Sequence, residues 1–148
     1  MPRSSAAAAQ QLGVVVQPLG VREPDDFDQA FAAMTRELPD AILMVSDALT
    51  LLNRKRVVEF ANARRLPTIF ENEPPVRDGG LMSYGPKQSE IGERAAYFVA
   101  RILAGARPAD LPLEVPTHFD LLINLKSAQA LGLSLPPTLV ARADEVIE

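Results

Sequence analysis

The chain has 148 residues, 47% of them hydrophobic, with a mean hydropathy of +0.04 and a formal net charge of −4 at pH 7. This length and apolar content are enough for one compact domain with a buried core. A pI near 5.1 argues against a nucleic-acid surface, which normally carries clustered Lys and Arg with an overall positive balance. The basic clusters at residues 54–56 and 64–65 are interpreted as a solvated helix face and helix-end charges, with contact to a small anionic partner as the alternative.

The absence of cysteine excludes disulfides, thiol nucleophiles and thiolate metal sites. The sequence contains no run of about 18 apolar residues, so it predicts no transmembrane helix. The first residues do not read as a secretory signal, because the alanines at 6–9 give way to Gln10 and Gln11 before an apolar stretch of roughly 7–15 residues is reached. As written, the polypeptide is not expected to be exported by that route.

Strands and helices are predicted to alternate through the first half of the chain. Short apolar runs indicate buried strands, and apolar residues spaced by three and four indicate helices that pack on a sheet. Alternation with short joints predicts right-handed crossovers and a parallel α/β sheet. The expected elements are a helix over 6–12 that ends at Gly13, a buried strand at 14–16, a helix beginning at Asp25 or Asp26, a strand at 41–45, a helix from about 51 to 65 and a strand at 66–70.

The second half begins with a change of direction. Turn residues at 73–75 and 78–80 interrupt the alternation. A long helix over 88–103 carries an apolar stripe, and Gly105 suits the position that ends it. The remaining expected elements are a short extended piece at 81–84, a Pro-rich crossing at 108–116, a strand near 119–123, a helix over 125–131 and a last helix after Pro136 and Pro137.

Polar pairs follow two of the predicted strands directly. Ser46 and Asp47 come after strand 41–45, and Glu71 and Asn72 come after strand 66–70. In an open parallel α/β sheet, ligands bind in the crevice beyond the carboxyl ends of the strands. The sequence therefore predicts a small-molecule site formed by these polar residues.

Several of these residues also have simpler interpretations. Asp47 is suited to cap the following helix, to bind a ligand cation, or to do both. Tyr84 is expected either to line the cleft or to pack with its hydroxyl in water. The carboxylates of Glu71, Glu73 and Asp78 are read as solvated loop groups, because no His lies near them in sequence to complete a common metal set.

No catalytic residue, metal site or cofactor is predicted. The lone His118 is placed on the surface crossing before the last predicted strand, and its spacing from Ser46 and Ser83 does not indicate a Ser-His-Asp arrangement. Neither a Walker pattern nor a G-x-G-x-x-G motif follows any predicted strand, which disfavours nucleotide binding. An enzyme of flavodoxin-like shape is the weakest interpretation for want of catalytic groups.

Three stretches in combination resemble one protein family. They are Leu81-Met82-Ser83-Tyr84-Gly85-Pro86, then Ala109-Asp110-Leu111-Pro112-Leu113-Glu114, then Leu122-Ile123-Asn124-Leu125-Lys126 followed by Ala128, Ala130, Leu131 and Gly132. They are similar to the C-terminal half of substrate-binding proteins of ABC transporters, in the branch that includes tryptophan- and phenylalanine-binding lipoproteins. The ending, residues 139–148, fits the same family. At position 72 the branch has Asp, whereas this chain has Asn72.

The resemblance implies the type I periplasmic-binding fold, in which two α/β lobes close on a ligand by hinge motion. The chain is expected to be a single domain, 1–148, with an incomplete three-layer parallel sheet. Segments 13–80 and 115–148 would form most of the second lobe, and segment 81–105 would pack on a first lobe that has no counterpart here. The chain is thus expected to be truncated. Hinge positions are assigned to Gly79, Gly80 and Gly85, and ligand contacts to Ser46, Asp47, Glu71, Asn72 and Tyr84.

By this resemblance, the chain is a non-enzymatic solute-binding component of an ABC uptake transporter, with an amino acid or organic acid as ligand and the transporter permease as partner. The alternative is a stand-alone α/β domain that self-associates, with a homodimer formed through the stripe of helix 88–103 and no bound solute. The location is periplasmic or membrane-anchored by resemblance, and cytoplasmic if the chain is the complete product.

Overall fold

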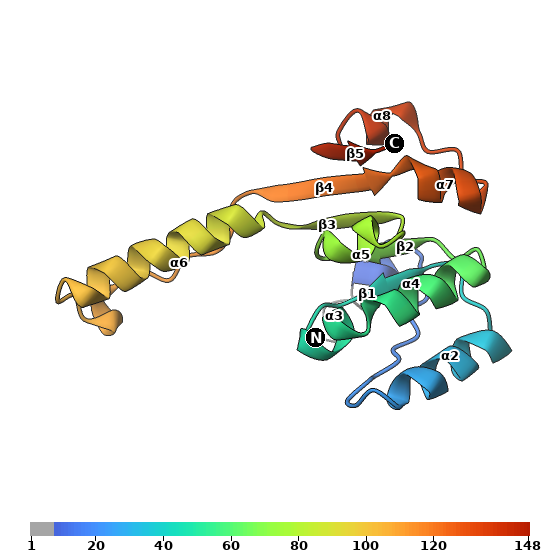
Figure 1. Ribbon diagram of the computed structural model, residues 1–148, viewed down its shortest axis with the longest axis horizontal. Helices are drawn as coiled ribbons and strands as arrows, with labels where there is room; N and C mark the ends of the chain where they lie inside the picture. The colour runs from blue at the N-terminus through green and yellow to red at the C-terminus, as the bar shows by residue number, and fades with distance from the viewer. Residues whose placement is uncertain (1–7) are drawn as a thin grey trace. The chain divides into compact units, whose positions relative to one another are not determined.

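The structure is a computed structural model that describes residues 8–148. The chain divides into two compact units, residues 1–38 and 39–148, where the sequence analysis expects a single domain. Figure 1 labels the helices and strands that make up these units. The first residues of the predicted helix 6–12 lie outside the described part of the chain.

The first unit contains helical residues 8–11 and helix α2 (Asp26–Arg36). Gly13 follows the first helical segment with a φ of +66°, which confirms it as the left-handed residue at a helix end. The predicted buried strand at residues 14–16 is wrong. Residues 14–16 have no strand structure, and Val15 is 95% exposed. A β-branched run needs a partner strand to form a ladder, and local preference alone does not provide one.

The second unit is built on a five-stranded sheet with strand order β1-β2-β3-β4-β5. Neighbouring strands are parallel except for β3 and β4, which are antiparallel. The predicted α/β fold with a mostly parallel sheet is thus confirmed. The last strand is a difference from the sequence-based expectation, which has only a helix after Pro136 and Pro137. The strands are β1 (Ile42–Met44), β2 (Thr68–Phe70), β3 (Met82–Pro86), β4 (Phe119–Asn124) and β5 (Glu145–Ile147).

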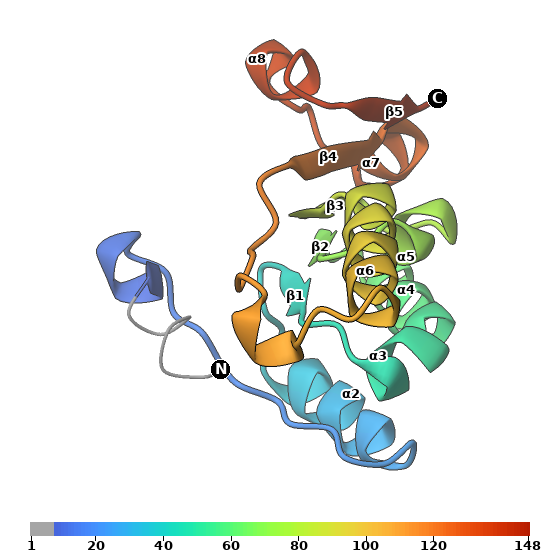
Figure 2. The same ribbon diagram turned by 90° about the vertical axis from the view of Figure 1, so that its left-hand side faces the viewer.

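Five short helices accompany this sheet, and in Figure 2 α4, α5 and α7 lie on one side of it. The single helix expected over 51–65 is two helices that meet at Asn53. Asn53 breaks the run because its side-chain amide donates to the carbonyl of Leu49 at 2.9 Å and its backbone leaves the helical region. Residues 74–77, which overlap the turn predicted at 73–75, form one helical turn instead. The helices are α3 (Ala48–Leu52), α4 (Arg54–Ala63), α5 (Pro74–Arg77), α7 (Leu125–Leu131) and α8 (Pro137–Val140).

The core of this unit lies between the sheet and α4, α5 and α7. Phe70 on β2, Val76 on α5 and Ile123 on β4 are almost completely buried. The buried side chain of Asn124 ties these elements together, because its Nδ2 donates to Val76 O at 3.1 Å and its Oδ1 accepts from Ser127 N at 3.0 Å. The same residue therefore caps α7 and satisfies a carbonyl of α5.

Helix α6 (Gln88–Leu103) extends beyond the sheet of its unit, and the two views agree on this (Figures 1 and 2). None of its 16 residues is buried. The chain returns along the helix, held by two hydrogen bonds from the Arg94 guanidinium to the carboxylate of Glu114. Near the base, His118 Nδ1 lies 2.8 Å from Glu90 Oε2, and this contact holds the pKa of Glu90 below its usual range. We call α6 and the return segment 104–118 the arm.

Candidate ligand site at the carboxyl edge of the sheet

The predicted site residues converge at one edge of the sheet. Strands β1, β2 and β3 are parallel, so their carboxyl ends meet at the same edge. Ser46 follows β1 after one intervening residue, and Glu71 and Asn72 follow β2 directly. Side chains that are 25 residues apart in sequence are therefore neighbours in space.

Ser46 joins the two strand ends through hydrogen bonds. Its backbone N–H donates to Glu71 Oε2 at 2.9 Å, and its hydroxyl donates to Asn72 Oδ1 at 2.9 Å. These bonds fix the side chains of both residues after β2 relative to the end of β1. The arrangement presents a positioned carboxylate and a positioned amide, which suit a polar or cationic ligand group.

The side chain of Asp47, unlike that of Ser46, caps helix α3. Its Oδ1 accepts from Thr50 N at 2.8 Å, and the Thr50 hydroxyl accepts from Asp47 N at 2.8 Å, which together form a capping box at the start of α3. The bond from the Thr50 backbone lowers the pKa of Asp47. The lining of the cavity described next does not include Asp47, so its assignment as a ligand contact stays a prediction.

A cavity of about 420 Å³ opens beside these strand ends, within the range of small-molecule sites in proteins. It brings together four of the five predicted ligand contacts. The sequence analysis missed Phe119, whose place was identified only as the start of a strand. The antiparallel pairing of β3 and β4 brings its ring beside Tyr84. The lining residues are Ser46, Glu71, Asn72, Tyr84, Gly85, Pro86, Gln88 and Phe119.

Two of the three glycines assigned to a hinge, Gly80 and Gly85, occupy tightly packed places. A Cβ on Gly85 would lie 1.8 Å from the carbonyl oxygen of Glu71, and a Cβ on Gly80 would lie 2.4 Å from Cε2 of Phe70. Gly79 has a φ of +109°, which disfavours other residues. Gly85 thus lets β3 pass directly beside the strand end that carries Glu71. The hinge role itself stays a prediction.

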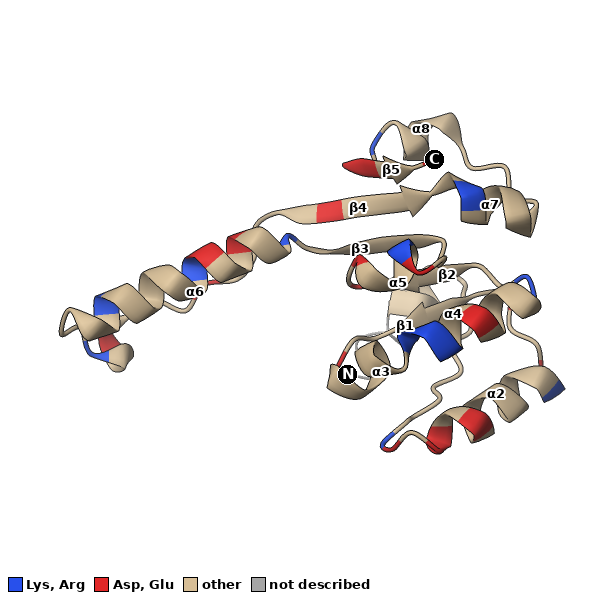
Figure 3. Ribbon diagram, viewed as in Figure 1, with Lys and Arg blue, Asp and Glu red and all other residues tan. Residues whose placement is uncertain are grey.

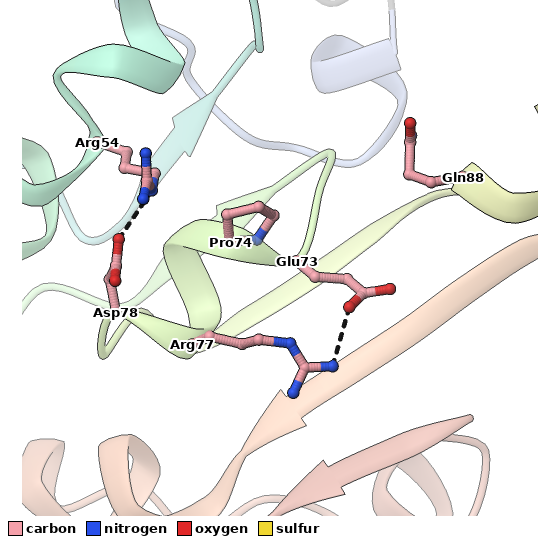
Figure 4. A pocket seen from close by; sticks show the side chains of 6 residues that line it. All are labelled: Arg54, Glu73, Pro74, Arg77, Asp78 and Gln88. Carbon is pink, nitrogen blue, oxygen red and sulfur yellow. Dashed lines mark hydrogen bonds and ion pairs between the residues drawn. The ribbon is translucent and has the colours of Figure 1, made fainter. Parts of the chain in front are cut away.

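A second cavity, of about 390 Å³, lies around α5 (Figure 4). Its charged groups are paired among themselves. Arg54 donates to Asp78 at 2.8 Å, and Arg77 donates to Glu73 at 2.9 Å and to Glu145 at 2.8 Å. Because these side chains are paired with one another, little unpaired charge remains in this cavity to bind a ligand. Arg54 is therefore an ion-pair partner, whereas the sequence analysis placed it on a solvated face.

No group of three or more His, Asp or Glu side chains in residues 8–148 is arranged to hold a metal ion. His118 is exposed, as expected for the surface crossing, and it pairs with Glu90 on the arm. Charges of both signs are mixed along α6 (Figure 3). Within residues 8–148, none of the helices combines the length and hydrophobicity needed to span a bilayer.

Comparison with known proteins identifies the family of this chain. A family model described as "ABC transporter substrate binding protein" matches residues 3–147. The chain belongs to this family. The family is one of non-enzymatic substrate-binding proteins and is typically extracytoplasmic. The family resemblance stated from the sequence is confirmed.

Solved structures support the same family assignment for this chain. An ABC domain from Streptococcus pneumoniae in complex with L-Trp has a TM-score of 0.91 and 27% identity, covering 99% of this chain and 49% of that one. A conserved domain protein from Vibrio cholerae has a TM-score of 0.90 and 26% identity, covering 98% of this chain and 49% of that one. The chain therefore matches about half of each solved structure.

Two curated proteins are also similar to this chain. A tyrosine-binding protein of Clostridioides difficile is 23% identical over 114 residues, which cover 77% of this chain and 33% of that protein. An uncharacterised protein of Rickettsia prowazekii is 31% identical over 87 residues, which cover 59% of this chain and 29% of that protein. The matches span about a third of each of these relatives.

Proposed function

We propose that this chain forms one wall of the solute site of an ABC uptake receptor, at the carboxyl edge of its sheet. The observation that carries the proposal is the bonded set of Ser46, Glu71 and Asn72 beside a cavity of about 420 Å³. Such convergence of a few polar groups in a concave site is the usual mark of a small-molecule site. Half-exposed cavity residues suit a wall that the other lobe of the receptor covers when the receptor closes.

The ligand we propose is an amino acid. The L-Trp complex of the Streptococcus pneumoniae domain and the tyrosine-binding protein of Clostridioides difficile support this class. In this chain, the Glu71 carboxylate is the group that would bind the ammonium of the ligand, since an ionised acceptor forms the stronger hydrogen bonds. Asn72 would complete the polar end of the site. An organic acid is the alternative ligand.

The proposal extends to the partner and the location. A receptor of this family delivers its solute to a transporter permease, and we propose an extracytoplasmic place of action for the protein to which this chain corresponds. The family match over residues 3–147 supports both statements.

Thermal unfolding with and without added amino acids tests the proposed site. A ligand that binds only the native state raises the melting temperature by mass action, so L-Trp or L-Tyr at millimolar concentration is expected to raise it. Glu71→Gln is expected to remove most of this shift. Glu93→Gln, an exposed change on α6 outside the cavity, serves as the matched control. Equal shifts in both variants would contradict the role of Glu71.

A second candidate function is self-association through the arm. Helix α6 exposes a set of large apolar side chains, and exposed patches of this kind mark interaction surfaces. A homodimer would cover them. Sedimentation equilibrium tests this proposal, because Val99→Asp is expected to shift a dimer toward monomer, and a monomeric parent chain would contradict it. The exposed apolar residues are Ile91, Tyr97, Val99, Ile102 and Leu103.

A further inference from the structure

The arm is held to itself by polar contacts. None of its residues, 88–118, is buried. The Arg94 guanidinium donates to the carboxylate of Glu114, and nearer the sheet Glu90 on α6 contacts Thr117 and His118 on the return segment. Segments with few buried apolar contacts open most easily. A change in one of these polar contacts is therefore expected to alter the order of the return segment.

The contact between Glu90 and His118 lies where the chain leaves the sheet for the arm and comes back from it. His118 Nδ1 is 2.8 Å from Glu90 Oε2, and the Thr117 hydroxyl donates to Glu90 Oε1 at 3.1 Å. The backbone N–H of Lys87 also donates to the carbonyl of His118 at 3.1 Å. Both oxygens of the Glu90 carboxylate are thus engaged by the return segment.

We propose that Glu90 and His118 form a proton-sensitive latch at the base of the arm, which closes when the imidazole is protonated. A protonated imidazole donates from both ring nitrogens, whereas a neutral one donates from a single nitrogen. A hydrogen bond between ionised partners is also roughly twice as strong as one between neutral groups. This inference goes beyond the proposed function, because the latch requires no bound ligand.

The pH range of the latch follows from its two members. A histidine ordinarily gains its proton below about pH 6.5, and a glutamate ordinarily keeps its charge above about pH 4.3. The latch is therefore expected to be closed between these values and to loosen as the pH rises through the histidine range. The hydrogen bond from His118 lowers the pKa of Glu90, which extends the closed range to more acidic pH.

The neighbouring charged groups do not account for a transition in this range. Histidine is the side chain whose ordinary pKa lies between about pH 5 and pH 8, and His118 is the single histidine of the sequence. Arg94 and Glu114 stay ionised here, because their hydrogen bonds raise the pKa of Arg94 and lower that of Glu114. The other titratable residues near the base of the arm are Tyr84, Lys87, Glu93 and Asp120.

The latch adjoins the cavity at the carboxyl edge of the sheet. Gln88, two residues before Glu90, and Phe119, directly after His118, both line that cavity. A closed latch therefore fixes the two chain crossings that carry these lining residues. Mildly acidic pH is expected to order this part of the cavity wall as well as the base of the arm.

Heteronuclear NOE measurements on the ¹⁵N-labelled 148-residue chain test the latch without a ligand. We expect the NOE of the amides in residues 113–118 to fall when the pH is raised from about 5.5 to about 7.5, across the ordinary pKa of histidine. His118→Gln, which keeps a donor but not the charge, is expected to give the lower value at both pH values. Glu90→Gln should also lose the pH dependence, whereas Glu93→Gln, a change at an exposed carboxylate of the same helix, should keep it.

The outcomes decide between the latch and a merely structural contact. An NOE that is equal at the two pH values in the parent chain would overturn the proposal. A pH dependence that persists in His118→Gln would overturn the role of His118, and one that persists in Glu90→Gln would overturn the pairing. Loss of the dependence in Glu93→Gln would show a general effect of the charge on α6, and the latch would be wrong. Circular dichroism at both pH values checks that each variant is folded.

Discussion

The carboxylate of Glu71 accepts a hydrogen bond from the backbone N–H of Ser46 at 2.9 Å, across the carboxyl ends of β2 and β1. The Ser46 hydroxyl donates to Asn72 Oδ1 at the same distance. Ser46, which follows β1, thus positions the side chains of Glu71 and Asn72, which follow β2. This relationship organises the polar part of the candidate site.

Ser46→Ala removes the hydroxyl bond to Asn72 and leaves the backbone bond to Glu71 in place. We expect amino-acid affinity to fall, because the Asn72 amide is then free to rotate away from its present place. The free energy of unfolding should change by only about 1 kcal/mol, since a single partly buried hydrogen bond is worth that much. Titration calorimetry and denaturant unfolding measure the two effects separately. A loss of stability without any loss of affinity would indicate a purely structural role.

Gly85→Ala is expected to destabilise the chain by about 1–3 kcal/mol, the usual cost of forcing extra atoms into a packed place. The reason is that the new Cβ would lie 1.8 Å from the carbonyl oxygen of Glu71, so β2 and β3 must separate. Urea unfolding measures the change. Gly92→Ala is the matched control, because nothing lies within 4 Å of its Cβ position on α6. This control should stabilise the helix by up to about 1 kcal/mol, and equal effects at both glycines would contradict the close approach.

Asn124→Ala removes two hydrogen bonds from the buried junction of α5, β4 and α7. The carbonyl of Val76 and the backbone N–H of Ser127 would each lose a partner. We expect a loss of about 1–3 kcal/mol, the penalty for leaving buried polar groups unpaired. Asn62→Ala, which removes one exposed bond to the Gly79 carbonyl at 3.2 Å, should cost clearly less. Comparable losses of stability in the two variants would contradict a special contribution of the buried Asn124 hydrogen bonds.

Because Asp47 caps α3, we expect part of the stability of the folded chain to depend on pH. The bond from the Thr50 backbone lowers the pKa of Asp47, so the ionised form is favoured in the folded state. Its stabilisation is present above the pKa of the unfolded chain, near 3.9, and is lost as the pH falls through the lower pKa of the folded state. Asp47→Asn keeps an acceptor and should remove this part of the acid sensitivity. Melting temperatures measured between about pH 2 and pH 6 compare the two proteins. Identical acid profiles would contradict the capping role.

Local sequence signals predicted the elements that depend on local chemistry. The carboxyl ends of β1 and β2 were located because apolar runs stop at polar pairs. Gly105, with a φ of +99° after α6, was identified because glycine suits a left-handed helix end. Four of the five predicted ligand contacts line one cavity because parallel strands share an edge.

The elements that were missed depend on pairing across the fold. Strand β5 is three residues long and is specified by its register with β4, where Leu122 pairs with Glu145 and Ile123 with Val146. The run at 14–16 has strong strand preference but is exposed in the structure. Phe119 reaches the cavity only through the antiparallel register of β3 and β4. The spacing of apolar residues predicts the structure of a single segment, but it does not show which other segment pairs with it.

The central claim is that the carboxyl edge of this sheet binds an amino acid. A titration of the ¹⁵N-labelled chain with L-Trp, followed by amide chemical shifts, tests it most directly. We expect saturable shifts at the amides of Ser46, Glu71, Asn72 and Tyr84, with the amides of α7 unaffected. Shifts that are absent from this edge, or that appear only along α6, would contradict the account.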